Sequence, residues 1–173
     1  MQSEHCFHYT SQLESPWSDV KPVVLGDGEA KGIYVLVSKH GSPRQVFSLA
    51  RSDRDECWFQ QEGIFWKGLC FIGLAERVYV VDSTGTIVNK LCLTEYFCGF
   101  ASGDDWLLVA TGGRILRLDQ HGNLLWQSAP LAIDGVSIGS VRDGSVFGQG
   151  EWDPPDGWLP FKLDLVNGTR QSI

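Results

Sequence analysis

Residues 114–126 read RILRLDQHGNLLW, and residues 77–88 read RVYVVDSTGTIV. Both stretches contain a run of apolar residues, then the pattern Asp-x-x-Gly, and then a second apolar run. An Asp side chain can accept a hydrogen bond from the backbone two residues on, and Gly adopts the left-handed conformation that closes a short hairpin. Each stretch therefore predicts two antiparallel strands joined by a tight turn.

Two degenerate copies of this unit lie on either side of the pair. Residues 32–41 keep the strand and the turn glycine but have Ser in place of Asp. Residues 161–170 keep both Asp and Gly, with one extra residue between them. The four turn glycines are 37 to 46 residues apart, which indicates a repeat of about 40 residues. They are Gly41, Gly85, Gly122 and Gly168.

The segments between the turns are short apolar runs bounded by Gly, Asp and Ser, which is typical of a meandering all-β protein. No segment has the apolar spacing of an amphipathic helix over a dozen residues. We expect these runs to be strands whose large side chains form the core. The core residues expected are Tyr34, Leu36, Phe47, Trp58, Phe71, Tyr79, Val81, Leu107, Leu116, Leu118, Trp126, Phe147 and Leu163.

The order of apolar strand, Asp-x-x-Gly, apolar pair and Trp in residues 115–126 resembles the blades of quinoprotein-type and WD-like β-propellers. The resemblance covers about residues 30–173 in four rough units. It implies an all-β fold, a propeller-like antiparallel meander of about four small sheets that is either a four-blade or an incomplete propeller. We expect one domain over residues 1–173, with residues 1–28 less regular. Cofactor chemistry does not carry over, because the quinone-binding constellation is missing, and we expect no cofactor.

Composition excludes several classes of protein. The chain has 173 residues, 43% hydrophobic residues and a formal net charge of −7. A disordered chain would be poorer in apolar residues, and a nucleic-acid binder that works by bulk charge would need a basic face. The start of the chain lacks the pattern of a secretory signal, and no apolar run is long enough to span a bilayer. We expect a cytoplasmic protein that binds neither membranes nor nucleic acid.

The cysteines agree with a reducing compartment. They are odd in number, and four of the five lie in apolar segments, so we expect reduced, buried thiols that act as small hydrophobic residues. The five are Cys6, Cys57, Cys70, Cys92 and Cys98.

Residues 150–161, GEWDPPDGWLPF, are the most distinctive local segment. They combine three carboxylates and two indoles without a basic residue. One interpretation is a long hairpin loop that covers a sheet edge; another is a rigid contact loop for a basic partner. A calcium site formed by its three carboxylates is a third, although the spacing does not match an EF-hand. The candidate partner-binding residues are Glu151, Trp152, Asp153, Asp156 and Trp158, joined by the turn residues Asp104, Asp105 and Asp134.

The sequence has no dinucleotide-binding or phosphate-loop pattern, and we expect no catalytic residues. His5, Cys6 and His8 have no second Cys/His group at zinc-site spacing, so we expect no metal. The sequence resembles, in type, the small acidic immunity proteins that neutralise bacterial toxins. We expect a non-catalytic module, monomeric or homodimeric, that binds and occludes a basic toxin domain such as a nuclease. Two alternatives stay open: a small hydrolase or lyase with its site in a propeller funnel, and a scaffold subunit that completes a propeller by oligomerising.

Overall fold

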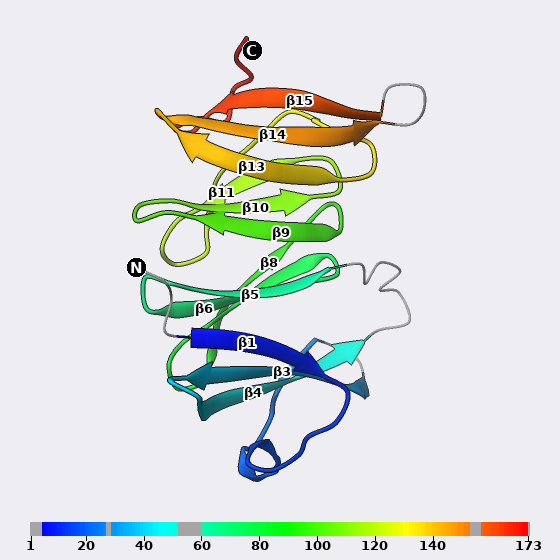
Figure 1. Cartoon of the computed structure of the whole chain (residues 1–173), viewed down its shortest axis with the longest axis vertical. Helices are drawn as coiled ribbons and strands as arrows, with labels where there is room; N and C mark the ends of the chain where they lie inside the picture. The colour runs from blue at the N-terminus through cyan, green and yellow to red at the C-terminus, as the bar shows by residue number, and fades with distance from the viewer. Residues whose placement is uncertain (1–4, 27–28, 52–59, 153–156, 173) are drawn as a thin grey trace.

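The computed structural model describes residues 5–26, 29–51, 60–152 and 157–172. These residues form strands in four small sheets, one short 3₁₀ helix, η1 (Trp17–Asp19), and no α-helix. The sheets follow one another along the longest axis of the molecule in the order of the chain (Figure 1). The expected all-β, propeller-like meander of four small sheets is therefore confirmed.

Sheets 2 and 3 are regular four-stranded antiparallel meanders, each with its strands in chain order. Sheet 2 consists of β5 (Gln61–Trp66), β6 (Leu69–Leu74), β7 (Arg77–Val81) and β8 (Ile87–Cys92). Sheet 3 consists of β9 (Phe97–Ser102), β10 (Leu107–Thr111), β11 (Ile115–Leu118) and β12 (Leu124–Gln127). The first strands of the two sheets, β5 and β9, are in contact, so they form the inner edge of the stack.

Sheet 4 has three named strands, β13 (Val136–Arg142), β14 (Ser145–Trp152) and β15 (Gly157–Asp164). The start of a fourth strand is visible after the last turn. Leu163 forms a bridge with Arg170, and the Gln171 N–H donates to the Lys162 carbonyl at 2.8 Å. Strand β13 contacts β9 and continues the inner edge formed by β5 and β9.

Sheet 1 departs from the repeat. Its strands are β1 (His5–Thr10), β2 (Val23–Leu25), β3 (Glu29–Lys39) and β4 (Ser42–Arg51), in the spatial order β1-β3-β4-β2. Strand β2 pairs with β4 in parallel, and β1 runs in the opposite direction to β9 and β13 (Figure 1). In sheets 2 to 4 each copy of the repeat is the third strand, counted from the inner edge, and the turn after it. The first copy, residues 32–41, instead lies in β3, the second strand of sheet 1, and Gly41 closes the hairpin to the third strand, β4. The reason is that residues 1–28, which lie outside the repeat, supply the inner strand β1 and the outer strand β2.

The Asp-x-x-Gly turns form as the sequence predicts. Asp119 Oδ1 accepts the N–H groups of His121 and Asn123 at 2.8 Å each, and the Gly122 N–H donates to the Asp119 carbonyl at 3.1 Å. Asp82 makes the same contacts with Thr84 and Thr86, whereas Asp164, whose turn is one residue longer, accepts the N–H groups of Val166 and Asn167. Gly85, Gly122 and Gly168 all have positive φ, which explains why glycine is required there.

The hydrophobic core lies between successive sheets in three clusters. Most expected core residues are buried in them: Phe47, Phe71, Tyr79, Val81, Leu107, Leu116, Leu118 and Leu163. Leu36 is also buried but belongs to none of the three clusters. Tyr34, Trp126 and Phe147 are only half-buried, and Trp58 lies outside the described residues. Phe147 faces away from sheet 3, and Arg142 and Lys162 lie over its ring.

The cysteines that the structure describes are free thiols, as expected. Cys70 is buried and Cys98 half-buried, but Cys6 and Cys92 are exposed. Cys92 faces solvent because β8 is the outer edge of sheet 2. Cys57 lies outside the described residues. Within the described ranges no helix is long and apolar enough to cross a membrane.

Candidate functional site

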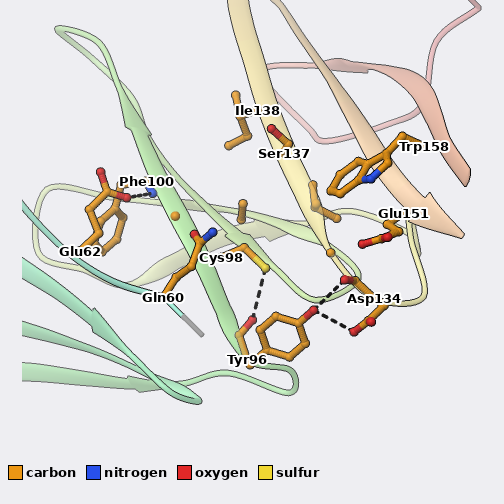
Figure 2. A pocket seen from close by; sticks show the side chains of 14 residues that line it. Gln60, Glu62, Tyr96, Cys98, Phe100, Asp134, Ser137, Ile138, Glu151 and Trp158 are labelled. Atoms are coloured by element: carbon orange, nitrogen blue, oxygen red, sulfur yellow. Dashed lines mark hydrogen bonds between the residues drawn. The ribbon is translucent and has the colours of Figure 1, made fainter. Parts of the chain in front are cut away.

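A pocket of about 580 Å³ opens on the inner edge of sheets 2, 3 and 4. Its walls come from β5, β9, β13 and the β14–β15 hairpin (Figure 2). Residues far apart in the sequence therefore meet there because each sheet begins with an inner strand. Glu62 and Gln60 lie on one side of the pocket and Glu151 and Trp158 on the other, with β9 between them (Figure 2).

Glu62 lies on β5 and reaches across to the neighbouring sheet. Its Oε2 accepts the N–H of Phe100, on β9, at 2.8 Å. Although the residue is exposed overall, desolvation of its carboxyl raises the pKa above the ordinary value, and the Phe100 N–H opposes that shift only in part. The ionised carboxylate is therefore under-solvated in the free protein, and a cation that approached it would restore part of the lost solvation.

Asp134 is held in place by Tyr96. The Tyr96 hydroxyl lies 2.7 Å from the Asp134 carbonyl and 2.9 Å from its Oδ1, so it donates to this oxygen pair. The backbone fixes the same loop to β14, because the Ile133 N–H donates to the Glu151 carbonyl and the Glu151 N–H to the Gly135 carbonyl, each at 2.8 Å. Asp134 and Glu151 are thus neighbours on one rigid wall.

The remaining surface of the pocket mixes polar and apolar groups, and exposed apolar side chains lie in and around it. The Trp158 indole is 47% exposed, and Ile133 and Leu159 nearby are 56% and 41% exposed. Exposed aromatic and aliphatic side chains grouped around a pocket are typical of protein contact surfaces. The pocket therefore combines apolar contact area with carboxylates that could orient a positively charged group.

Cys98 lies in the wall of the pocket but is poorly suited to nucleophilic chemistry. Burial raises the pKa of its thiol, and the carboxylates of Glu95 and Asp134 raise it further. The thiol therefore stays protonated at neutral pH. The described residues that line the pocket include no Lys, Arg or His, and the described chain holds no group of three side chains suited to a metal ion.

The structure brings together three of the eight residues proposed from the sequence: Asp134, Glu151 and Trp158 all line the pocket. Asp104 and Asp105 follow the end of β9, whereas Asp134 precedes the start of β13. Because β9 and β13 run in the same direction, the two groups lie at opposite rims of the stack (Figure 1).

The expected long loop in residues 150–161 is shorter than the sequence indicated. Strands β14 and β15 stay paired as far as Trp152 and Gly157, so Glu151 and Trp158 are cross-strand partners within the sheet. Trp152 is half-buried at the end of β14. Asp153 and Asp156 lie outside the described residues, and with them two of the three carboxylates of the calcium alternative.

Sequence reasoning missed Glu62, Tyr96 and Phe100. Glu62 lies on β5 of sheet 2, whereas Phe100 lies on β9 of sheet 3 and Tyr96 directly precedes that strand, and no local motif marks any of them. The repeat itself could have predicted them. The first strand of each repeat unit lies on the same inner edge, so polar residues on these first strands are expected to lie close together.

Comparisons with known proteins support the fold. No protein-family model and no curated protein matches the chain. Among solved structures, BamB from Moraxella catarrhalis is 14% identical with a TM-score of 0.55, covering 81% of this chain and 45% of its own. The WD40 domain of Pan2 from Neurospora crassa is 13% identical with a TM-score of 0.53, covering 80% of this chain and 45% of its own.

This chain spans about half the length of these two structures. At such low identity the likeness shows a propeller-like fold and no activity, since one fold carries many functions. The expected resemblance to β-propellers is therefore confirmed for the architecture alone.

Proposed function

We propose that this protein is a non-catalytic binding module whose inner-edge pocket receives a basic protein partner. In the narrower form of the proposal it is an immunity protein, which occludes a bacterial toxin domain such as a nuclease. The observation that carries the proposal is the pocket itself, in which Glu62, Asp134 and Glu151 lie around a mixed surface that includes the Trp158 indole, with no cation among the described residues that line it. The proposal includes a cytoplasmic location, where partner and inhibitor would meet.

Charge supports a basic partner both while the partner approaches and once it is in contact. The net charge of −7 accelerates the approach of a positively charged protein and competes with a nucleic-acid substrate for the same face. At contact, the three carboxylates would pair with Lys or Arg side chains of the partner. The Coulomb attraction between opposite charges is stronger in a desolvated contact than at the open surface, because the effective dielectric constant is lower in the contact.

Rigidity supports a specific contact. Trp158 and Glu151 lie on paired strands, and the 133–135 loop is tied to β14 by backbone hydrogen bonds. Side chains held in this way lose little conformational entropy on binding, and a large, partly exposed indole is a typical energetic anchor.

The test is capture of partners on the immobilised protein from its native host, followed by titration with the purified partner. We expect one basic partner bound at nanomolar affinity, with Trp158→Ala and Glu151→Gln each weakening the complex about 10- to 100-fold. Asp104→Asn is the matched control, because it removes one negative charge from the opposite rim, and it should change the affinity less than threefold. Equal affinities for all variants would refute the site, and failure to protect cells from the captured partner would refute the immunity role.

A second candidate function is a small hydrolase or lyase that uses the same pocket. Three carboxylates in one pocket, with the pKa of Glu62 raised by desolvation, are an arrangement that general acid catalysis also needs. Against it, Glu62 and Asp134 both already accept hydrogen bonds from the protein. A screen of glycoside, ester and phosphoester substrates separates the two functions: turnover that disappears in Glu62→Gln would favour the enzyme.

A further inference from the structure

We propose that the inner-edge pocket receives the guanidinium group of an arginine side chain, seated over Gly99 on β9. This arginine site rests on the proposed function, because it names the chemical group by which the basic partner enters the pocket. Gly99 is half-buried in the wall of the pocket, within a strand. It is the one feature of the wall that the packing of the described residues does not require.

Glycine weakens a strand relative to alanine, so a glycine within a strand has a packing reason or marks a place where a ligand or another backbone comes close. Most strand glycines that the structure describes have a packing reason, because an added Cβ would collide with a neighbouring side chain or carbonyl. These are Gly63, Gly73, Gly148 and Gly150. Gly139 lies at the register shift of β13.

No such reason applies to Gly99 within the described part of the chain. A Cβ added there would lie 3.4 Å from Glu62 Oε2 and 3.9 Å from the side-chain amide of Gln60, and both are ordinary contact distances. The φ angle of Gly99 is not positive, and the unpaired residue at the nearby register shift is Cys98. The space over Gly99 is therefore left open, and groups that line the pocket border it.

The groups around this space call for a cation that donates hydrogen bonds. Every charged side chain among the described residues of the lining is a carboxylate. Glu62 is oriented by the Phe100 N–H, which donates to Oε2 at 2.8 Å, so Oε1 is left for a ligand. Across the pocket, no hydrogen bond or ion pair of the Glu151 carboxylate is found among the described residues (Figure 2).

The open floor favours a guanidinium over an ammonium group. A glycine within a strand exposes a flat peptide surface, against which the planar guanidinium can lie while its fork of N–H groups points sideways. Glu62 and Gln60 border the same space, so donors on one group can reach both. A guanidinium is also more weakly hydrated than an ammonium, so it loses less on entering a pocket whose lining includes Phe100 and Trp158.

Two probes that carry the same single positive charge separate the two groups: N-acetyl-L-arginine amide and N-acetyl-L-lysine amide. Backbone amide chemical shifts follow their binding at millimolar concentration and do not need the partner. We expect saturable shifts of the Gly99 and Phe100 signals with the arginine probe, and at least about fivefold weaker binding of the lysine probe. Equal binding of the two probes, or no saturable shift with the arginine probe, would overturn the proposal.

Substitution of the floor tests where the probe lies. Gly99→Ala fills the space beside Glu62 and should weaken binding of the arginine probe at least about fivefold, yet its thermal midpoint should equal or exceed that of the wild type, since alanine suits a strand better. Gly139→Ala, in a strand but outside the lining, is the matched control and should bind the probe as the wild type does. Unchanged binding in Gly99→Ala would contradict the arginine site.

Failure of the arginine site and failure of the proposed function give different results. A captured partner whose affinity falls in Trp158→Ala but not in Gly99→Ala would keep the binding function and overturn the arginine site. Specific binding of the arginine probe, with no partner captured from the host, would support the arginine site and refute the proposed function.

Discussion

Gly73 connects the packing of the sheets to the candidate site, and Gly73→Ala tests that connection. The residue lies near the end of β6, directly opposite Glu62 on β5, and is buried. A Cβ atom built on it would lie 2.3 Å from Cε2 and Cζ of the Phe97 ring. Phe97 begins β9 and is 1% exposed, so the ring lies flat against the glycine at the contact between sheets 2 and 3.

The expected cost follows from this geometry. Because buried Phe97 has little room to withdraw, the added methyl group must separate the two sheets or rotate the ring. Overpacking of this kind costs about 1–3 kcal/mol. A loss of about 2 kcal/mol would lower the thermal midpoint of a chain of this size by roughly 4–8 °C. The gain that Gly→Ala normally brings in a strand, about 0.5–1 kcal/mol, works against this cost and does not cancel it.

Urea unfolding followed by tryptophan fluorescence measures the effect, with Gly139→Ala as the matched control. Gly139 also lies in a strand without positive φ, and its added Cβ would meet the Phe147 carbonyl at an ordinary 3.6 Å. The control should stay within about 0.5 kcal/mol of the wild type.

The clash with Phe97 can be tested directly by a second substitution. Phe97→Leu removes part of the ring, so the double variant Gly73→Ala/Phe97→Leu should be more stable than additivity predicts, by about 1–2 kcal/mol. If Gly73→Ala matches its control, or if the two changes are additive, the inter-sheet packing described above is wrong. Because Gly73 pairs with Glu62, a destabilised Gly73→Ala should also bind the basic partner more weakly.

Three further predictions follow from single contacts. Asp119→Ala removes the acceptor of two backbone N–H groups and should lower the free energy of unfolding by about 1–2 kcal/mol, a loss that urea unfolding would detect and that Gln120→Ala in the same turn should not reproduce. Glu62→Gln should raise the free energy of unfolding at neutral pH, because the folded protein raises the pKa of this carboxyl above 4.5 and thus disfavours its ionised form. Urea unfolding at several pH values should show this gain vanish as the pH falls below 4.5. A variant less stable than the wild type at pH 7 would contradict the raised pKa of Glu62. Thiol labelling mapped by mass spectrometry should modify exposed Cys6 and Cys92 rapidly and leave native Cys70 unlabelled, since burial raises the pKa of its thiol to about 12.

The fold could be predicted because its determinants are local. An Asp that bonds to the backbone two and four residues on, followed by a glycine with positive φ, specifies the same turn wherever it occurs, and residues 82–86 and 119–123 bear this out. The strand order of sheet 1 could not be predicted, because it depends on contacts that are not local. The parallel pairing of β2 with β4 joins segments more than 20 residues apart, and no local pattern in residues 1–28 predicts it.

The candidate site was predictable only where charge and aromatic residues cluster in the sequence. Glu151 and Trp158 were found in this way, because they flank one hairpin and are cross-strand neighbours. Glu62 and Tyr96 were missed, since their proximity depends on how inner strands of separate sheets come together. Asp105 was included for its charge alone. It follows the end of β9, at the rim opposite the pocket, and forms an ion pair with Lys67 at 3.3 Å.

The sheet 4 end of the stack argues against the alternative in which the protein completes a propeller by oligomerising. The outward face of sheet 4 carries Arg142 and Lys162 over Phe147, at 4.7 and 5.7 Å from the ring centroid, and two cations there disfavour the packing of another sheet.

The edge of sheet 4 is protected as well. Asp164 and Lys162 exchange backbone hydrogen bonds with the last turn and the C-terminal residues, so by alternation Pro160 is the next residue that faces the free edge, and it has no N–H to offer. A new strand would find a missing donor at that point. An assembly through this end would therefore have to overcome both features, whereas the inner-edge pocket presents exposed Trp158 beside carboxylates and needs no rearrangement. These features agree with the proposed binding along the inner edge.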